Sequence, residues 1–295
     1  MKSGFVALAG RPNAGKSTLL NALLQEKLAI VSPKPQTTRS EIRGILNLKD
    51  AQIIFTDTPG IHKPGHRLET RMNRQASNVI QGVDVVYLVV DGSVPYSSGD
   101  EYVLRMIRQL DVPVFLLLNK IDLMPREKVL KVLSSWQKRY DFAEFFPVSA
   151  AKQGDFEDLI ATTLKYLPEG EAMYPQDMTN AEPLNFRMAE LIREKILYCT
   201  EEEVPHATAV LVEDSRFAED HYDVRALVMV EKQGQKASVI GRQGRMIGRI
   251  ISQSEKELEK LLGAPVALDL YVRVEEEWRD RDHRITEYGY GNIDE

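Results

Sequence analysis

The sequence predicts two domains: an α/β domain built on a mostly parallel sheet with helices on both faces, and a smaller α+β domain after it. Three observations support this prediction. Short apolar segments alternate with segments of helical length in residues 1–168, as in parallel sheets whose strands are connected by helices. Residues 169–184 contain prolines and no clear periodicity, which indicates a linker. In residues 185–295 the order of helices and strands changes, and the chain of 295 residues is long enough for two ordinary domains.

The first domain contains six short segments that are apolar and rich in β-branched or aromatic residues, which predicts strands over 4–10, 41–48, 51–57, 83–91, 112–120 and 143–149. Helices are expected between them, such as those over 16–25, 126–140 and 156–167. The second domain is expected to run helix, strand, strand, helical stretch, strand, over 185–200, 207–214, 222–232, 236–262 and 265–274.

Composition narrows the class of protein. Hydrophobic residues at 43% and charged residues at 28% are ordinary for a soluble globular protein. Cys199 is the only cysteine, so no disulfide can form within the chain, which fits a reducing cytoplasm. Residues 1–10 have no cleavage-type site and are better explained as a strand than as a signal peptide. The most apolar windows are much shorter than the roughly 20 residues that span a bilayer, so we expect any membrane contact to be peripheral.

Net charge does not indicate a nucleic-acid partner, but its distribution is uneven. The chain carries −6 overall, while residues 181–295 hold 16 basic and 24 acidic side chains. Within that acidic half, the stretch from Lys232 to Ser254 contains five basic residues and no acid. Such a patch can bind phosphate inside an acidic domain, although it is also compatible with a solvated helix face.

The segment GRPNAGKS follows the first predicted strand and precedes a helix, and it satisfies the phosphate-binding pattern G-x-x-x-x-G-K-[ST]. Glycines let backbone N–H groups surround phosphates, and the helix N-terminus adds positive potential. We expect Lys16 to reach the β- and γ-phosphates and Ser17 to bind Mg²⁺. The predicted nucleotide contacts in this segment are Gly10, Arg11, Pro12, Asn13, Ala14, Gly15, Lys16 and Ser17.

A second phosphate-sensing motif, D-x-x-G, follows the strand 51–57. Asp57 is predicted to hold Mg²⁺ through water, and the N–H of Gly60 to meet the γ-phosphate, with Thr58 and Pro59 between them. In many such switches the next residue is a glutamine that orients the attacking water. Here it is Ile61, whose side chain neither donates nor accepts a proton. Either the chain does not hydrolyse nucleotide, or another group handles the water.

The polar loop PKPQTTRS lies between these two motifs and contains two threonines. One hydroxyl is expected to complete the magnesium shell when nucleotide is bound, and we favour Thr38 over Thr37. An order–disorder change in such a loop reports which nucleotide is bound.

Two further motifs predict guanine specificity. NKID, after the strand 112–120, places a carboxylate at Asp122 that accepts from both N1–H and the exocyclic amine of guanine, a donor pair that adenine lacks. The aliphatic part of Lys120 can lie along the base. SAA, after the next strand, can supply a backbone N–H to guanine O6. Because all these motifs follow strands, they meet in the usual crevice of an α/β sheet, and the nucleotide is GTP. The base contacts are Asn119, Lys120, Ile121, Asp122, Ser149, Ala150 and Ala151.

The second domain contains VIGRQGRMIG, with a G-x-x-G loop between two helical segments. KH domains clamp about four nucleotides with such a loop. A lone G-x-x-G is weak evidence, but the predicted order of elements around it matches a type II KH domain and the local basic run supports it. The predicted RNA contacts are Lys236, Ile240, Gly241, Arg242, Gln243, Gly244 and Arg245. The apolar residues Val239, Met246 and Ile247 either line the groove or belong to the core.

Taken together, the motifs GRPNAGKS, PKPQTTRS, DTPGIH, NKID, SAA and VIGRQG resemble those of the Era family of bacterial GTPases, and the resemblance covers nearly the whole chain. It implies a Ras-like P-loop GTPase domain over 1–168 and a type II KH domain over 185–295. It also implies slow hydrolysis of GTP, binding of the 3′ end of 16S ribosomal RNA, and assistance in 16S rRNA processing and 30S subunit biogenesis.

The resemblance further implies a cytoplasmic protein with peripheral association with the inner membrane, and we expect a monomer. The sequence departs from the family in two respects. Arg242 and Gln243 stand where Asn-Lys-like residues are commoner, and the KH half is strongly acidic outside the loop. Both departures bear on RNA affinity.

The resemblance also bears on the missing glutamine. GTPases with an apolar residue directly after D-x-x-G and an asparagine in the phosphate-binding loop include potassium-activated members. We expect the amide oxygen of Asn13 to ligate K⁺, with backbone carbonyls of residues 33–38 closing its shell, and the cation to supply charge near the γ-phosphate. The predicted catalytic group is therefore Asn13, Lys16, Thr38 and Gly60. The alternative is that Asn13 only braces the loop.

Two other functions remain open at this stage. In the first, the KH-like half is a module that docks a protein or the membrane surface, and the chain is a signalling switch. A nucleotide-hydrolysing metabolic enzyme is the third option, but no second group of acid, base or metal ligands supports it. The five histidines are scattered, and we expect them to be surface or loop residues.

Overall fold

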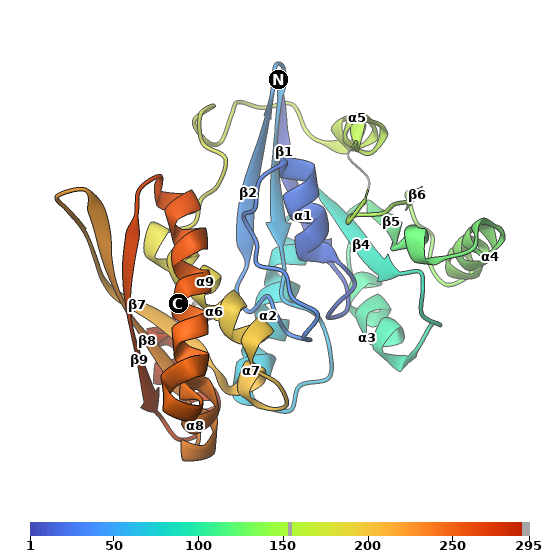
Figure 1. The fold of residues 1–295 in the computed structure, drawn as a ribbon. Coiled ribbons are helices and arrows are strands. Elements are labelled where there is room, and N and C mark those ends of the chain that lie inside the picture. The colour runs from blue at the N-terminus through green and yellow to red at the C-terminus, as the bar shows by residue number, and fades with distance from the viewer. Residues whose placement is uncertain (153–154, 291–295) are drawn as a thin grey trace. The chain divides into compact units, whose positions relative to one another are not determined.

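The computed structural model describes residues 1–152 and 155–290 and divides into two compact units (Figure 1). The first comprises residues 1–31, 38–65 and 69–181, and the second comprises 182–295 together with the short segments 32–37 and 66–68. Each unit is described by itself. In the described residues, no helix has both the length and the apolar character needed to cross a bilayer.

The first unit is built on a six-stranded sheet in the order β2-β3-β1-β4-β5-β6. Strand β2 runs antiparallel to β3, and the remaining pairs are parallel. The predicted parallel sheet is thus confirmed, with one antiparallel edge strand. The strands are β1 (Lys2–Ala9), β2 (Ile42–Leu48), β3 (Ala51–Asp57), β4 (Val85–Asp91), β5 (Val114–Asn119) and β6 (Glu144–Pro147).

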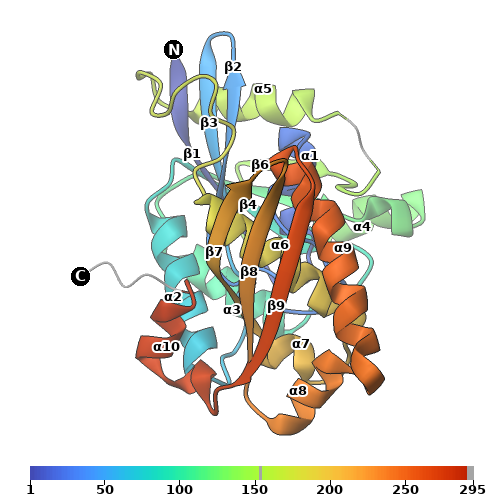
Figure 2. The same cartoon turned by 60° about the vertical axis from the view of Figure 1, so that its left-hand side comes forward.

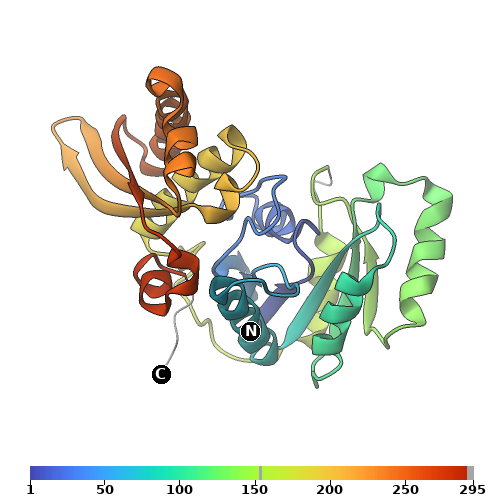
Figure 3. The ribbon, with the colours of Figure 1, turned by 90° about the horizontal axis from the view of Figure 1, so that it is seen from below.

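Helices flank both faces of this sheet, as the ribbon seen from below shows (Figure 3). On one face, alternate residues of β1, β4 and β5 form a core with residues of α2, α3 and α4. On the other face Tyr87 of β4 bonds to Thr163 of α5 and stacks on Phe115 of β5. The helices are α1 (Lys16–Leu24), α2 (Arg67–Gln81), α3 (Ser98–Ile107), α4 (Arg126–Gln137) and α5 (Glu157–Tyr166), with a 3₁₀ turn η1 (Ile121–Leu123).

The proline-containing segment after α5 has no helix or long strand, but it is not loose. Gln52 of β3 accepts from the N–H groups of Met173 and Tyr174 and donates to the Tyr174 carbonyl. The Ile45 N–H of β2 donates to the Thr179 carbonyl at 2.8 Å. Residues 169–181 therefore run along β2 and β3 and belong to the first unit.

The second unit contains a three-stranded sheet in the order β7-β8-β9, shown from its open face in Figure 2. Strands β7 and β8 are antiparallel, and β8 and β9 are parallel. Helices α6 and α9 pack on one face of the sheet and enclose a core of valine, isoleucine and leucine side chains. The elements are α6 (Leu184–Cys199), α7 (Val204–Ala207), β7 (Ala209–Ala218), β8 (His221–Val230), α8 (Gln233–Ile240), η2 (Arg242–Gly244), α9 (Arg245–Leu262), β9 (Val266–Val274), η3 (Trp278–Asp280) and α10 (Asp282–Glu287).

The order α6, β7, β8, α8, α9, β9 confirms the predicted α+β arrangement. Helices α2, α3, α7 and α10 were not identified from the sequence. α7 and α10 are too short to show a period. α2 is mostly polar in composition, and its buried residues include the polar Glu69 and Asn73.

Candidate nucleotide site and nucleic-acid interface

The phosphate-binding loop lies between β1 and α1, and two of its glycines adopt backbone angles that disfavour a side chain. The φ angles are +151° at Gly10 and +98° at Gly15. A Cβ at Gly10 would lie 2.3 Å from the Val89 carbonyl oxygen, and one at Gly15 would lie 2.2 Å from Asn119 Nδ2. The loop therefore requires glycine at both positions.

Lys16 and Asp57 form the charged centre of this site, and both side chains are buried. Lys16 Nζ donates to the carbonyls of Gly10 at 3.2 Å and Arg11 at 3.1 Å. Burial lowers the pKa of Lys16, and the attraction of Asp57 opposes it. Burial raises the pKa of Asp57, and Lys16 and two hydroxyl donors oppose it. Because neither charge is well hydrated, both gain from further counter-charges: phosphate for the lysine and a cation for the carboxylate.

Three oxygen-bearing side chains converge next to this lysine. Ser17 Oγ donates to Asp57 Oδ2 at 2.5 Å, and the Thr38 hydroxyl lies 2.7 Å from Ser17 Oγ and 3.2 Å from Asp57 Oδ2. Asp57 Oδ1 is buried and has no hydrogen-bond partner among the described residues. A partnerless carboxylate oxygen beside two hydroxyls is a donor set that suits Mg²⁺, so the residues present fit this ion. The Thr37 hydroxyl instead donates to the Lys34 carbonyl at 2.7 Å.

The turn after β3 comes close to the phosphate-binding loop. A Cβ at Gly60 would lie 2.7 Å from the backbone nitrogen of Pro12. The Ile61 N–H donates to the Gly10 carbonyl at 3.0 Å, and the Ile61 side chain is buried in the core of the first unit. The side chain at the position where many switches carry glutamine therefore faces the protein interior.

His62 lies in the loop after this turn, as expected for the histidines, and its contact with the turn was not predicted. Its Nδ1 lies 2.8 Å from the Gly60 carbonyl oxygen. Because a carbonyl only accepts, this hydrogen bond places a proton on Nδ1. Asn73 of α2 holds the His62 backbone by accepting from its N–H at 3.3 Å and donating to its carbonyl at 2.6 Å. The available signal was the position of His62 two residues after Gly60.

Arg11 and Thr58, two of the predicted nucleotide contacts, have side chains that bond to other parts of the first unit. Arg11 Nη1 donates to Ser97 Oγ at 2.8 Å and to Asp100 Oδ2 at 3.0 Å, at the start of α3. The Thr58 hydroxyl donates at 2.8 Å to a backbone carbonyl of β1. These two side chains therefore fix the loops that carry them and do not project away from the protein.

Asn119 connects three of the sequence motifs. Its Nδ2 donates to the Ala14 carbonyl at 2.9 Å, and its Oδ1 accepts from the Ala150 N–H at 3.0 Å. The phosphate-binding loop, NKID and SAA are therefore brought together at the carboxyl ends of β1, β5 and β6, where ligands bind in open α/β sheets.

The Asp122 carboxylate and the Lys120 ammonium group, which are predicted to contact the base, are each held by a partner. Ser149 Oγ donates to Asp122 Oδ1 at 2.7 Å, and this hydrogen bond lowers the pKa of Asp122. Lys120 Nζ lies 2.6 Å from Asp91 Oδ2. The contact of Asp91 with Lys120 was not predicted, because only the pairing of β4 with β5 places Asp91 opposite Asn119.

In the second unit the G-x-x-G loop joins α8 to α9. Gly241 and Gly244 have φ angles of +71° and +73°, and Gln243 has +54°. A Cβ at Gly241 would lie 2.6 Å from Met246 Cβ. The loop backbone is therefore tight, and glycine leaves it open to close approach by a ligand backbone.

The side chains of this loop point outward. Arg242, Gln243 and Arg245 are exposed, and in residues 1–152 and 155–290 no hydrogen bond or ion pair involves their side chains. Of the flanking apolar residues, Val239 is fully buried in the core, whereas Ile240 is only partly buried.

The fold and these residues define a P-loop GTPase with a C-terminal KH domain. The family described as 50S ribosome-binding GTPase matches residues 5–120, and the KH domain family matches residues 203–279. The chain is 42% identical over 291 residues to GTPase Era of Clostridium kluyveri, covering 98% of this chain and 99% of that one. It is 43% identical over 293 residues to GTPase Era of Lacticaseibacillus paracasei, covering 99% and 98%. The chain belongs to the Era family of GTPases, and it is a GTP-hydrolysing enzyme.

Two solved structures share the fold over 99% of this chain and 100% of theirs, each at 37% identity. One is a single-residue variant of Aquifex aeolicus Era bound to GDP and AlF₄⁻, with a TM-score of 0.95. The other is Era in complex with MgGDPNP and nucleotides 1506–1542 of 16S ribosomal RNA, with a TM-score of 0.96. The resemblance drawn from the motifs is thereby confirmed.

Proposed function

We propose that this GTPase binds the 3′ end of 16S ribosomal RNA through its KH domain and assists 16S rRNA processing and 30S subunit biogenesis. The observation that carries the proposal is the exposed Gly241–Gly244 loop, whose basic side chains have no partner among the described residues. A relative of this chain was solved with a 16S rRNA fragment.

In the GTP site we assign roles by contact. Lys16 binds the β- and γ-phosphates, the Gly60 N–H meets the γ-phosphate, and Asp122 reads guanine. Ser17, Thr38 and Asp57 hold Mg²⁺, which neutralises phosphate charge when bound. The convergence of the two hydroxyls on Asp57, and the partnerless Asp57 Oδ1, support this assignment.

Asn13 is the proposed ligand of a potassium ion. The Ile61 side chain is buried, so it leaves the attacking water without a side-chain partner at this position. Asn13 lies in the phosphate-binding loop with φ +62°, an unusual angle that asparagine tolerates and that sets the direction of its side chain. A cation on its amide oxygen would add positive charge near the γ-phosphate.

RNA recognition would begin at the Gly241–Gly244 loop. Its backbone lies against phosphates, Arg242 and Arg245 add charge, and Ile240 offers an apolar contact to a base. We propose that the protein acts as a monomer in the cytoplasm, where ribosomal subunits mature. Peripheral contact with the inner membrane is supported by the family resemblance alone.

The direct test is binding of labelled RNA that carries the 16S 3′ end, at several salt concentrations. We expect the logarithm of the affinity to fall linearly with the logarithm of salt concentration, with a slope of about −0.7 per neutralised phosphate. An unrelated RNA of equal length should bind more weakly. Absence of RNA binding would favour the alternative function, in which the KH domain docks a protein or a membrane surface.

A charge reversal in the loop tests the site itself. Replacing Arg242 and Gln243 with Asp places like charge against phosphates and should weaken RNA binding by about 2–5 kcal/mol. GTP binding should be unchanged.

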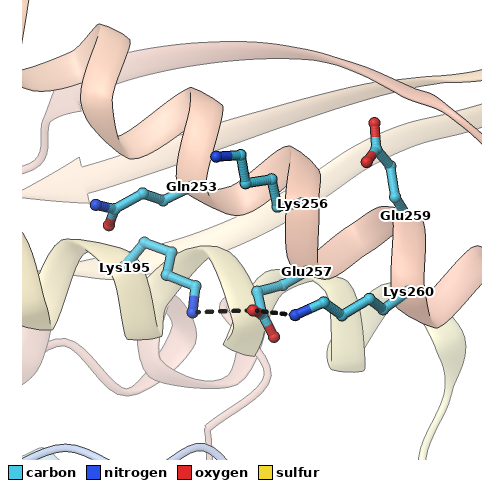
Figure 4. Close-up of a pocket in the computed structure, with 6 residues that line it drawn as sticks. All are labelled: Lys195, Gln253, Lys256, Glu257, Glu259 and Lys260. Carbon is cyan, nitrogen blue, oxygen red and sulfur yellow. Dashed lines mark hydrogen bonds and ion pairs between the residues drawn. The ribbon is translucent and has the colours of Figure 1, made fainter.

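A matched control lies elsewhere in the same unit. Gln253 and Lys256 line a surface cavity of α6 and α9 in which Lys195 and Lys260 pair with Glu257 (Figure 4). Replacing Gln253 and Lys256 with Asp changes the net charge by the same amount as the loop variant. Equal losses in the two variants would indicate a general charge effect and contradict a loop site.

A further inference from the structure

The sheet of the second unit has one face that α6 and α9 leave open (Figure 2). Along β9, Val266, Leu268 and Leu270 are buried on the helix side, and the alternate residues are exposed. Among those alternate residues is Tyr271, whose side chain is 51% exposed.

The Tyr271 ring is positioned by a residue of the neighbouring strand and by a hydrogen bond of its hydroxyl. Leu227 of β8 is paired with Tyr271 in the parallel register and is only 6% exposed. The Tyr271 hydroxyl donates to Asp269 Oδ2 at 2.7 Å, and Arg225 Nε lies 3.9 Å from the same oxygen. The ring is therefore held by its hydroxyl, while half of its surface stays accessible for stacking.

Around the ring the surface is hollowed and mainly basic. A cavity of about 540 Å³, a size common for ligand sites, is lined by Glu213, Arg225, Leu227, Lys236, Tyr271 and Arg273 among others. In the described part of the chain no carboxylate lies within 4.0 Å of Lys236 or Arg273, whereas the Arg225 guanidinium faces Asp269. Two basic groups without acidic partners are thus available to phosphate.

One residue that lines this cavity lies on the helix that precedes the G-x-x-G loop. Lys236 lies on α8, the helix that ends at Ile240 and leads directly into that loop. A strand of RNA held by the loop can therefore continue past Lys236 onto β9. An aromatic face flanked by basic side chains is the combination that binds single-stranded nucleic acid.

We propose that the open face of β8 and β9 binds a further nucleotide of single-stranded RNA, with its base stacked on Tyr271 and its phosphates beside Arg273 and Lys236. The proposal rests on the RNA binding proposed above and extends the footprint beyond the nucleotides held by the loop.

The test compares two labelled oligonucleotides by fluorescence anisotropy, one of about four nucleotides and one of about eight, in the range of known single-strand footprints. Tyr271→Ala should lower affinity for the longer RNA by about tenfold, because one stacked base is lost. Affinity for the shorter RNA should stay as in the unaltered protein. Tyr271→Phe keeps the ring and loses only its hydroxyl contact, so it should lower affinity for the longer RNA much less than Tyr271→Ala does. Unchanged binding of the shorter RNA by Tyr271→Ala separates loss of stacking from a folding defect.

Charge variants test the phosphate contacts. Arg273→Ala and Lys236→Ala should each reduce the steepness of the salt dependence for the longer RNA by about 0.7. Lys256→Ala removes one positive charge from the cavity in Figure 4 and should leave both affinities and the slope unchanged.

The outcomes separate this inference from the proposed function. If the Arg242 and Gln243 double variant loses RNA while Tyr271→Ala binds the longer RNA normally, the sheet-face site is overturned and the loop site stands. Equal losses in Tyr271→Ala and Tyr271→Phe would also overturn it. If the unaltered protein binds neither oligonucleotide, the proposed RNA function fails with it.

Discussion

At the scale of single residues, the GTP site is held together by the protein's own side chains. Asn119 links the phosphate-binding loop to the SAA segment, and Ser149 fixes the Asp122 carboxylate. These contacts hold the Asp122 carboxylate and the SAA backbone, the two groups proposed to contact the base, without help from a ligand. Single substitutions should therefore change specificity without disturbing the fold.

The first prediction concerns the base. Asp122→Asn removes the negative charge and replaces one of the two accepting oxygens by an N–H₂ donor, so one of the guanine donors loses its acceptor and GTP should bind at least about tenfold more weakly. Xanthosine triphosphate, which presents a carbonyl in place of the amine, should bind better than GTP. Competition binding with the two nucleotides measures both effects, and normal GTP affinity in the variant would show that Asp122 does not read the base.

The second prediction concerns the monovalent cation. GTP turnover should be slow in both salts but faster in potassium than in sodium at equal ionic strength, because K⁺ on Asn13 would stabilise charge at the γ-phosphate. Asn13→Ala should abolish this difference. Ile61→Ala should keep most of the activity, since the Ile61 side chain lies in the core. Equal rates in the two salts would exclude the cation and leave Asn13 as a residue that braces the loop.

At the scale of secondary structure, helix α6 carries a buried ion pair one turn apart. Arg193 is fully buried, and its Nε and Nη2 donate to the two carboxylate oxygens of Glu190 at 2.7 and 2.6 Å. The two parallel hydrogen bonds pair the opposite charges in a place that water does not reach. Arg193 Nη2 also donates to the Thr37 carbonyl, so the pair joins α6 to the segment 32–37 of the same unit.

A stability prediction follows from this pair. Glu190→Gln removes the carboxylate that is hydrogen-bonded to the buried Arg193 guanidinium and should lower the free energy of unfolding by about 3–5 kcal/mol. Urea unfolding measures the change. Glu287→Gln removes one of the two acidic partners of the more exposed Arg284 on α10 and should have little effect by comparison. Similar losses in the two variants would mean that burial of the Arg193 pair is not what matters.

At the scale of the whole molecule, the two units have separate hydrophobic cores. One is formed by the six-stranded sheet with α2, α3 and α4, and the other by the three-stranded sheet with α6 and α9. The motifs GRPNAGKS, DTPGIH, NKID and SAA belong to the first unit. The G-x-x-G loop belongs to the second unit, as do residues 33–37 of the PKPQTTRS loop. Each site is thus supported by its own core.

This division predicts that nucleotide stabilises one part of the molecule. With a GTP analogue and Mg²⁺ at about 100 times the dissociation constant, the first unit should gain about 2.7 kcal/mol. Differential scanning calorimetry should show two transitions, of which the analogue raises one. Lys16→Ala should remove that rise. A single transition raised as a whole would show that the two units unfold together.

The sequence by itself determined the order of strands and helices around the motifs, and it located the motifs of the proposed GTP site. Phosphate-binding loops and base-reading loops are local, and each follows a strand, so spacing along the chain is enough to identify them. The same holds for the loop from Gly241 to Gly244, where glycine is required by the backbone angles.

Only the tertiary structure decided the contacts between segments that are distant in the chain. Asp91 reaches Lys120 because β4 and β5 are neighbours, and residues 169–181 lie along β2 and β3 because backbone groups there are paired. Ile61 is turned into the core, and Tyr271 is exposed, although both are large apolar-rich side chains. Burial depends on which face of a strand or turn another element covers, and that is a property of the packed chain rather than of any local pattern.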